Sequence, residues 1–451
     1  MLNPSIFRAY DIRGIYPDEL NEKTAYQIGR AFAVYLKENE VNKPEKVVVG
    51  YDARVSSPIL KRSFIEGILD EGINIWDIGL VTVDMVYFAS GHFNLPAAMI
   101  TASHDPKDWN GFKLMKNGVE FFNVQDLEII ISEKKGTPLQ GKGEVTEGDI
   151  KGDYLKHVLS FIDAEAIRPM RIVIDASSGA VGPVLKLILE KLPLEYLPIN
   201  FSPNGKFPNH EPDPTKEKNI TDLRNTVSAG HYHFGCAFDG DGDRIIFVDE
   251  RGEAANPSII GALMARYFLK QYPYGKIVYS AVASKIIPDI ISIYNGEAIR
   301  ERVGHTFIKK HLKETDGILG IETSGHYYFK KNFYADSGII SFLVMLNILS
   351  SEKKSLSVLV SEFSKYVSIP ETNLKIINPQ EFIKRIAQNF EGYDIDWLDG
   401  LTVRTSDFWL NLRPSNTEPL VRLNIEAKDE LILNRVKDDL VKLIEKEKAS
   451  L

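Results

Sequence analysis

Cysteine is almost absent from the chain: Cys236 is the single thiol among 451 residues. One cysteine excludes an internal disulfide, and we expect it to pack as a small apolar side chain rather than to react. A chain without disulfides is typical of a reducing compartment. The sequence therefore favours a cytoplasmic protein.

Long apolar runs are also missing. The longest, around residues 339–349, is shorter than the roughly 20 residues that a membrane-spanning helix needs, and it predicts a buried helix. The first residues lack a basic segment followed by an apolar one, so we expect no signal peptide. No low-complexity segment interrupts the chain. These absences predict a protein without a membrane partner.

An excess of positive charge is lacking as well. Lysine and arginine number 54 against 62 acidic residues, which gives a net charge of −8. This balance argues against a general nucleic-acid binder. The hydrophobic content of 44% is enough to form several cores, and the length suggests about three domains.

Strand-like and helix-like stretches alternate through most of the chain, which predicts α/β layers. Ser56 or Ser57 is a plausible N-cap for the first predicted helix. The predicted strands are 47–50, 97–100, 171–175, 276–279 and 317–321, and the predicted helices are 58–69 and 179–189.

The C-terminal part follows a different pattern. Stretches 401–404 and 408–412 predict neighbouring strands joined by a turn, 420–427 alternates like a third strand, and 431–444 predicts an amphipathic helix. This α+β pattern indicates a small independent domain. Changes in composition near residues 150, 252 and 368 predict four segments: 1–151, 152–252, 253–368 and 369–451.

An alternating run of acids and glycines, Asp239-Gly240-Asp241-Gly242-Asp243-Arg244, is the most informative segment; we call it the acidic turn. Apolar strands at 234–238 and 245–248 bracket it, which predicts a hairpin with the acids at its tip. Three carboxylates this close repel one another unless a cation sits between them, and oxygen ligands favour Mg²⁺. The arginine fork beside them suits a phosphate.

Two other interpretations of the acidic turn remain open. One is an ordinary solvated surface. The other is a calcium-binding EF-hand, because Glu250 stands at the twelfth position; however, Arg244 occupies the sixth position, where that loop needs glycine.

Ser103 follows a predicted buried strand, in a loop that Pro106 keeps from becoming helical. A serine there can act as a nucleophile if it is activated, although the adjacent His104 does not form a recognised hydrolase motif. An ordinary turn residue is the alternative. Lys113 can act as acid or base if its pKa is lowered; otherwise it is a surface lysine.

Four further segments carry polar groups that suit an anion, sugar hydroxyls or proton transfer. Residues 413–419 combine an arginine, two hydroxyls and an amide, which can form an anion cradle or a simple polar turn. Residues 322–326 offer a carboxylate and a hydroxyl for sugar hydroxyls. His305 supplies a titratable imidazole, with a purely structural histidine as the alternative, and residues 10–14 offer another anion contact.

Together these motifs resemble the α-D-phosphohexomutase superfamily over nearly the whole chain. The matching segments are 7–14 (opening segment), 101–106 (phosphoserine loop), 239–244 (metal loop), 322–326 (sugar-specificity loop) and 413–419 (phosphate-binding loop).

The resemblance implies four domains around a central cleft: three related α/β domains with mixed sheets, and a smaller, mobile C-terminal α+β domain. It implies reversible transfer of phosphate between the 1- and 6-positions of a hexose phosphate, through a phosphorylated Ser103 and a hexose 1,6-bisphosphate. One Mg²⁺ per subunit would be held by the Ser103 phosphate, Asp239, Asp241 and Asp243.

The resemblance also implies roles for the remaining residues. Lys113 and His305 become acid/base candidates, and Arg13 and Arg244 would neutralise phosphate charge. The other residues expected to bind substrate are Tyr10, Glu322, Ser324, His326, Arg413, Ser415, Asn416, Thr417 and Arg422.

The preferred hexose is not decided by these motifs. Asn416 and the Glu-Thr-Ser sugar loop resemble phosphomannomutases and phosphoglucomutases, whereas phosphoglucosamine mutases typically have Gly and Gln at positions 416 and 323. Thr323 departs from the Met of many mannose-acting members. An apolar Val282 or Ala283 stands where some bifunctional members carry lysine. A phosphoglucosamine mutase, a metal-dependent phosphatase and a non-catalytic sugar-phosphate binder remain alternatives.

Overall fold

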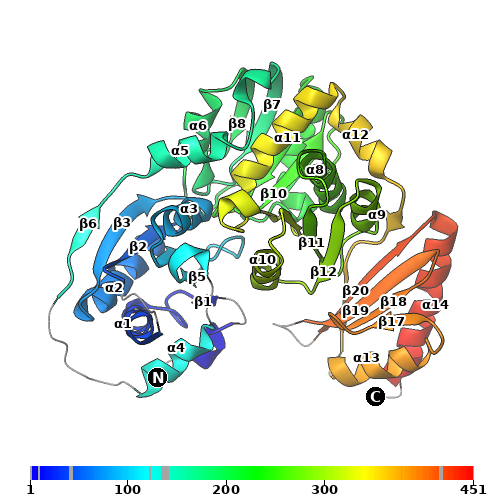
Figure 1. The fold of residues 1–451 in the computed structure, drawn as a ribbon. Helices are drawn as coiled ribbons and strands as arrows, with labels where there is room; N and C mark the ends of the chain where they lie inside the picture. Colours follow the sequence, from blue (N-terminus) through cyan, green and yellow to red (C-terminus); the bar gives the residue numbers. More distant parts are fainter. Residues whose placement is uncertain are drawn as a thin grey trace. The chain divides into compact units, whose positions relative to one another are not determined.

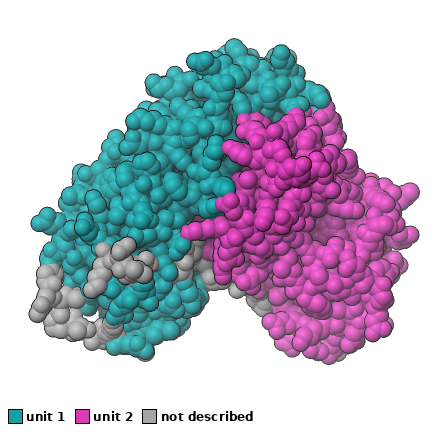
Figure 2. All heavy atoms as spheres, in the orientation of Figure 1, with its two compact units in different colours: residues 1–257, 324–358 teal, residues 258–323, 359–451 magenta. Residues whose placement is uncertain are grey.

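The computed structural model describes residues 3–8, 11–39, 44–120, 123–133, 142–376, 378–415 and 420–449. The chain divides into two compact units, coloured separately in Figure 2. Unit 1 comprises Met1–Pro257 and Ser324–Val358, and unit 2 comprises Ser258–Thr323 and Leu359–Leu451. No helix among these described ranges is both long and apolar enough to cross a membrane.

The first sheet of unit 1 is mixed (Figure 1). Its order is β1 (Ile12–Ile15), β5 (Trp109–Met115), β4 (Ala97–Ile100), β2 (Lys46–Tyr51), β3 (Asn74–Leu80) and β6 (Val145–Glu147). Strand β2 runs parallel to β3 and β4, whereas β5 is antiparallel to β4 and β1. The unbroken apolar run Val47–Val49 is fully buried because both faces of this central strand are covered.

The helices of this part are α1 (Glu22–Asn39), α2 (Ser57–Asp70), α3 (Val83–Phe93) and α4 (Gln125–Glu133). The predicted helix 58–69 is confirmed as α2; Ser56 is its N-cap residue but its side chain makes no capping hydrogen bond. Helices α1 and α2 approach closely where each carries a glycine. A Cβ on Gly29 would lie 2.1 Å from the Phe64 carbonyl oxygen.

The second sheet of unit 1 has the order β10 (Ile245–Asp249), β9 (Phe234–Phe238), β7 (Met170–Asp175) and β8 (Leu194–Ile199). The predicted hairpin is confirmed, with Phe238 opposite Ile245. Cys236 on β9 is fully buried, and burial raises the pKa of its thiol well above the ordinary value, in agreement with a packing role.

The remaining elements of unit 1 are α5 (Lys151–Leu159), α6 (Val181–Leu189), α7 (Thr221–Ala229), β14 (Tyr327–Phe329) and α11 (Gly338–Glu352). Helix α12 (Leu356–Phe363) crosses from unit 1 into unit 2.

Unit 2 begins with a third set of parallel strands. They have the order β12 (Glu297–Glu301), β11 (Lys276–Ser280) and β13 (Leu319–Ile321), accompanied by α8 (Pro257–Gln271), α9 (Ile286–Ile293) and α10 (His305–Glu314). The three sheets share a set of three parallel strands. The central strand is β2, β7 or β11, and it runs parallel to a neighbour on each side, in the orders β3-β2-β4, β8-β7-β9 and β12-β11-β13. In each set the central strand comes first along the chain. The three α/β parts therefore share one strand order, as the sequence pattern and the resemblance predict.

The C-terminal part is an antiparallel sheet accompanied by helices, which confirms the predicted α+β pattern; α14 contains the predicted helix 431–444, and α13 was not predicted. Its strands are β15 (Val367–Ser368), β16 (Thr372–Lys375), β17 (Asp394–Asp396), β18 (Leu401–Arg404), β19 (Phe408–Pro414) and β20 (Leu420–Ala427), with α13 (Pro379–Gln388) and α14 (Glu430–Ala449). Strands β15 and β16 both pair with β20, and β19 lies between β20 and β18. The apolar faces of these elements form their own core. The four predicted segment boundaries themselves stay a prediction.

Candidate active site

The acidic turn joins β9 to β10 at the tip of the hairpin. The carboxylates of Asp239, Asp241 and Asp243 are almost completely buried, and one oxygen of each lies within 4.8 Å of the others. Oδ1 of Asp239 accepts hydrogen bonds from the backbone N–H groups of Gly242 at 3.0 Å and Arg244 at 3.2 Å, which closes the turn. A solvated surface is therefore wrong for this segment. An EF-hand is also wrong, because it needs helices where β9 and β10 stand.

Ser103 lies in the loop between β4 and β5, as predicted, and is buried. Its φ of +51° is unusual for a residue other than glycine and marks a constrained position. Its Oγ donates a hydrogen bond to Oδ2 of Asp239 at 2.7 Å. Its backbone N–H donates to Oγ1 of Thr101 at 2.8 Å, and that oxygen lies 3.2 Å from Oδ2 of Asp241. The serine loop and the acidic turn, 136 residues apart along the chain, therefore meet in one site.

Lys113 lies on β5 and is buried, so the surface-lysine alternative is wrong. Its Nζ donates to Oδ2 of Asp241 at 2.8 Å and to Oδ2 of Asp243 at 2.7 Å. Burial alone lowers the pKa of an ammonium group, but these two carboxylates outweigh burial and hold the pKa of Lys113 above its ordinary value. This is opposite to the lowered pKa that we required of an acid/base lysine, so Lys113 serves here as a counterion.

The surroundings of the acidic turn shift the pKa values of Asp239 and Asp243 in opposite directions. Burial, followed by repulsion from Asp241 and Asp243, raises the pKa of Asp239 well above its ordinary value. Burial acts in the same direction on Asp243, but the charge of Lys113 and the contact with His326 outweigh it and hold the pKa of Asp243 well below the ordinary value. Two neighbouring carboxylates therefore differ in their tendency to be ionised.

The donor set fits a hard divalent cation. Oδ1 of Asp241 is buried and has no hydrogen-bond partner among the described residues, although a buried carboxylate oxygen normally has one. Carboxylate oxygens are the ligands that Mg²⁺ prefers, usually together with phosphate oxygens. A phosphate on Ser103 would add such oxygens, because the Ser103 hydroxyl already contacts Asp239.

Two arginines lie beside this site. Arg13 on β1 donates from Nε to Oδ2 of Asp11 at 2.7 Å and from Nη1 to Oδ2 of Asp105 at 2.9 Å. Its second bond holds the loop that carries Ser103. Nε of Arg244 lies 4.0 Å from Oδ2 of Asp239, and this buried atom has no hydrogen-bond partner in the part of the chain that the structure describes. Arg244 therefore keeps a donor that an anion can use.

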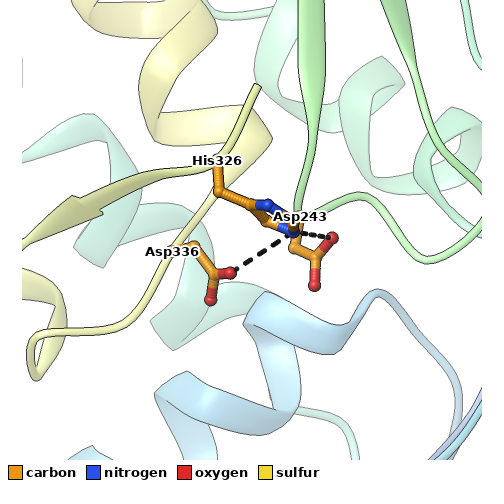
Figure 3. Close-up of side chains that lie close together, drawn as sticks. All are labelled: Asp243, His326 and Asp336. Carbon is orange, nitrogen blue, oxygen red and sulfur yellow. Dashed lines mark hydrogen bonds and ion pairs between the residues drawn. The ribbon is translucent and has the colours of Figure 1, made fainter. Parts of the chain in front are cut away.

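His326 packs against the acidic turn (Figure 3). Its Nε2 lies 3.2 Å from Oδ1 of Asp243 and 3.7 Å from Oδ2 of Asp336, and its Nδ1 lies 2.8 Å from Oγ of Ser324. The imidazole thus joins a serine of the predicted sugar loop to an aspartate of the acidic turn. Asp336, which is buried, was missed by the sequence analysis because no local motif surrounds it.

Arg54 is the second residue that the sequence analysis missed. It is almost fully buried, pairs with Asp52, and donates to the backbone carbonyl oxygens of Ser103 at 2.8 Å, Asp105 at 2.6 Å and Pro106 at 2.7 Å. One guanidinium therefore sets the course of the serine loop. The sequence held one signal for this role: Asp52 and Arg54 are oppositely charged residues that follow the predicted buried strand 47–50, where functional loops often begin.

The predicted site residues Glu322 and His305 belong to unit 2. Glu322 is buried, and its Oε1 accepts a hydrogen bond from the backbone N–H of Gly304 at 3.0 Å. His305, the next residue, begins α10. The predicted sugar-binding carboxylate and the predicted imidazole therefore belong to adjoining segments.

The phosphate-binding segment lies at the end of β19. Arg413 on this strand is opposite Arg422 on β20, and both donate to the carboxylate of Glu371, at 2.9 and 3.2 Å. Burial alone would raise the pKa of Glu371, but these two arginines outweigh it and lower that pKa. The backbone N–H of Ser415 donates to the Leu420 carbonyl oxygen at 2.9 Å. Three predicted residues lie outside the described residues: Tyr10, Asn416 and Thr417.

Known proteins share both the sequence and the architecture. Sequence models for the phosphoglucomutase/phosphomannomutase family match four successive parts of the chain. They are α/β/α domain I at residues 4–137, α/β/α domain II at 152–252, α/β/α domain III at 256–366 and the C-terminal domain at 369–443.

Individual relatives match over almost their whole length. The phosphomannomutase of Methanocaldococcus jannaschii is 35% identical over 451 residues, covering 99% of each chain. The phosphomannomutase/phosphoglucomutase of Pseudomonas aeruginosa (strain PAO1) is 35% identical over 97% of this chain and 94% of its own. A phosphoglucomutase/phosphomannomutase family protein from Burkholderia thailandensis superposes with a TM-score of 0.91 at 30% identity, covering 99% of this chain and 98% of its own. With all four domains matched in order and full-length relatives above 30% identity, the chain belongs to the phosphoglucomutase/phosphomannomutase family, within the α-D-phosphohexomutases.

Proposed function

We propose that this phosphohexomutase interconverts the 1- and 6-phosphates of mannose, glucose or both through a phosphorylated Ser103. The observation that most directly supports this proposal is the hydrogen bond of 2.7 Å from Oγ of Ser103 to Oδ2 of Asp239, within a buried cluster of three carboxylates. A serine placed there has the surroundings to carry a phosphoryl group: acidic metal ligands on one side, and the cations Arg13, Lys113 and Arg244 nearby.

The proposed reaction has two balanced halves. First, a free sugar hydroxyl bonds to the phosphorus of phosphorylated Ser103, the bond from phosphorus to Oγ breaks, and the proton of the hydroxyl passes to a base. The product is a hexose 1,6-bisphosphate. After this molecule turns end for end, the deprotonated Oγ bonds to its other phosphorus, the bond from that phosphorus to the sugar oxygen breaks, and this oxygen takes the proton that the base received in the first half.

The residues divide this work between them. Asp239, Asp241 and Asp243, with the Ser103 phosphate, would hold one Mg²⁺, which neutralises charge on the transferring group when bound. Arg13 and Arg244 would do the same from the protein side. Because the pKa of Lys113 is raised, its ammonium group is a weak proton donor. His305 is therefore the better candidate for proton transfer.

Substrate binding is assigned to two groups of residues. Glu322, Ser324 and His326 would contact ring hydroxyls, because they offer carboxylate, hydroxyl and imidazole groups in one segment. The phosphate that is not reacting would be bound at the end of β19, where two arginines already bind one carboxylate. The remaining residues proposed for substrate contact are Tyr10, Arg413, Ser415, Asn416, Thr417 and Arg422.

The alternatives are less well supported. Asn416 and Thr323 depart from the residues typical of phosphoglucosamine mutases, and the relatives with the identities given above are named phosphomannomutase or phosphomannomutase/phosphoglucomutase. A sugar-phosphate binder without turnover does not require a buried serine beside an acidic metal site. The lone buried cysteine supports a reducing, cytoplasmic setting for the reaction.

The test compares mannose 1-phosphate, glucose 1-phosphate and glucosamine 1-phosphate, each with Mg²⁺ and a trace of the matching 1,6-bisphosphate, by ³¹P NMR. We expect the 6-phosphate of mannose or glucose to appear. Turnover of glucosamine phosphate alone would overturn the substrate assignment. Release of inorganic phosphate in place of the 6-phosphate would indicate a phosphatase.

A further inference from the structure

Unit 2 contains a cavity of about 190 Å³ that takes no part in the proposed reaction. One wall comes from β11, β12 and the segment after them, with Tyr279 and Arg300. The opposite wall comes from β18, β19 and β20, with Arg404 and Trp409. None of the described residues proposed for phosphoryl transfer or hexose binding lines it, so an occupant would define a separate site.

The aromatic walls of this cavity are held in place by hydrogen bonds. The indole N–H of Trp409 donates to Oε1 of Glu426 at 2.8 Å, and the same oxygen accepts the backbone N–H of Lys285 at 2.8 Å. Glu426 is only 4% exposed. The hydroxyl of Tyr366 donates to Asp289 at 2.5 Å. Because these rings are already ordered, a ligand that packs on them loses little free energy to reorganisation.

Two guanidinium groups line the cavity beside these rings. Arg300 and Arg404 both donate to a single oxygen, Oδ2 of Asp396, and Arg404 also donates to Asp394 at 3.0 Å. For Arg300, this is the one hydrogen bond that the described residues provide, although its guanidinium carries five N–H donors. Further N–H groups therefore remain for a planar anion, which an arginine fork binds with two parallel hydrogen bonds.

Other charges at the cavity favour the same kind of ligand. Lys285 lines it and places its Nζ 5.8 Å from the centre of the Tyr366 ring. The acid Asp407 is bound by Lys428 at 2.9 Å. Glu426 is engaged by the indole and backbone N–H groups described above, and burial raises its pKa above the ordinary value. The free hydrogen-bonding capacity of the cavity is thus mostly that of cationic donors.

We propose that this cavity binds a flat aromatic acid, meaning one or two fused rings that carry a carboxylate or phosphate. The rings would pack among Tyr279, Tyr366 and Trp409, and the anionic group would contact Arg300 and Arg404. Aromatic packing supplies most of the buried area, and the arginine pair supplies selectivity for the charged form. The site is independent of the proposed mutase reaction.

The test titrates the full chain with 1-naphthoate by calorimetry, in the presence of saturating glucose 1-phosphate and Mg²⁺. We expect saturable binding at one site per chain, and much weaker binding of the uncharged 1-naphthalenemethanol. Arg300→Gln should weaken 1-naphthoate binding by about tenfold, the typical value of a lost charged hydrogen bond. Ala281→Leu, which fills a wall position that is 4% exposed, should abolish binding.

Two controls keep the result interpretable. Arg251→Gln removes an arginine that pairs with an aspartate but lies outside unit 2, and it should bind 1-naphthoate like the wild type. Circular dichroism and mutase turnover check that Arg300→Gln and Ala281→Leu are folded. Absence of saturable binding in the millimolar range would overturn the proposal. Binding that survives both cavity variants, or that glucose 1-phosphate displaces, would overturn it as well.

Discussion

At the scale of single residues, the site depends on Ser103 and on the groups that hold its loop. The hydroxyl faces Asp239, and its strained backbone is fixed by Thr101 and Arg54. A positive φ costs free energy in a residue with a side chain, so surrounding contacts must maintain it. This arrangement separates residues that react from residues that position them.

Replacement of the serine tests the reacting role. Ser103→Ala should lower kcat by roughly a thousandfold or more, because the residue that would carry the phosphoryl group is removed. The melting temperature should stay close to that of the wild type, since the residue lies in a loop. Intact-mass spectrometry should find one phosphate on the wild type and none on the variant. Near-normal turnover in Ser103→Ala would contradict the phosphoserine proposal.

Arg54 tests the positioning role. Arg54→Met should destabilise the protein by roughly 3–5 kcal/mol, because it leaves the buried carboxylate of Asp52 without its partner and frees the loop carbonyl groups. Urea unfolding measures this change. Arg251→Met is the control: its side chain is 63% exposed, and its buried partner Asp249 keeps hydrogen bonds from the backbone N–H groups of Arg251 and Glu253, so this variant should stay much closer to the wild type. Equal stability of the two variants would show that Arg54 does not hold the loop.

His210 gives a pH-dependent contribution to stability. Burial lowers the pKa of its imidazole, but the hydrogen bond and charge of Asp175 at 3.0 Å outweigh burial and raise that pKa above the ordinary value. Folding therefore favours the protonated form, so this stabilisation is complete below the unfolded pKa of about 6.5 and is lost as pH rises through the higher folded value.

The measurement is the difference in unfolding free energy between wild type and His210→Gln across this pH range. We expect the advantage of the wild type to be largest on the acid side and to shrink as pH rises. An advantage that grows with pH would contradict the raised pKa.

At the scale of elements, glycines decide how closely α1 and α2 pack. A Cβ on Gly67 in α2 would lie 2.2 Å from the backbone oxygen of Tyr26 in α1, a distance that neither helix can accommodate without moving. Gly152 in α5 has no atom within 4 Å of the corresponding position. The same substitution should therefore have opposite effects in the two helices.

Gly67→Ala should destabilise the protein by about 1–3 kcal/mol, since overpacking exceeds the gain in helix propensity. Gly152→Ala should be neutral or stabilising by up to about 1 kcal/mol, because only propensity changes. Chemical denaturation of both variants is the measurement. A Gly67→Ala protein as stable as Gly152→Ala would show that α1 and α2 do not approach as closely as described.

At the scale of the whole molecule, activity should depend on a metal ion although the site already contains cations. Lys113 neutralises part of the acidic turn, but Asp241 retains a buried oxygen without a partner. Removal of divalent ions with a chelator should abolish turnover, and added Mg²⁺ should restore it. Far-ultraviolet circular dichroism should change little, because backbone hydrogen bonds to Asp239 close the turn without a metal. Full turnover in the chelated enzyme would contradict the proposed metal site.

Local patterns identified most of the elements that carry the site. The apolar run 97–100 and the hairpin 234–248 were predicted because burial on both faces leaves an unbroken apolar signal. The roles of Arg54 and Asp336 were not predicted. The serine-loop carbonyl groups that Arg54 binds lie 49 residues or more away along the chain, and His326 lies 10 residues from Asp336; no periodicity records such contacts.

The sequence by itself determined the α/β class, the α+β tail, the hairpin with its acidic tip and the family. Each of these could be predicted from apolar patterns or motifs that occupy short stretches of residues. Only the tertiary structure decided which charges meet: that Lys113 neutralises two aspartates 128 and 130 residues away, that Ser103 contacts Asp239, and that Arg54 is buried under the serine loop. The physical reason is that periodicity reports burial of a segment, whereas ionic partners and pKa values depend on which segments the fold brings within a few ångströms.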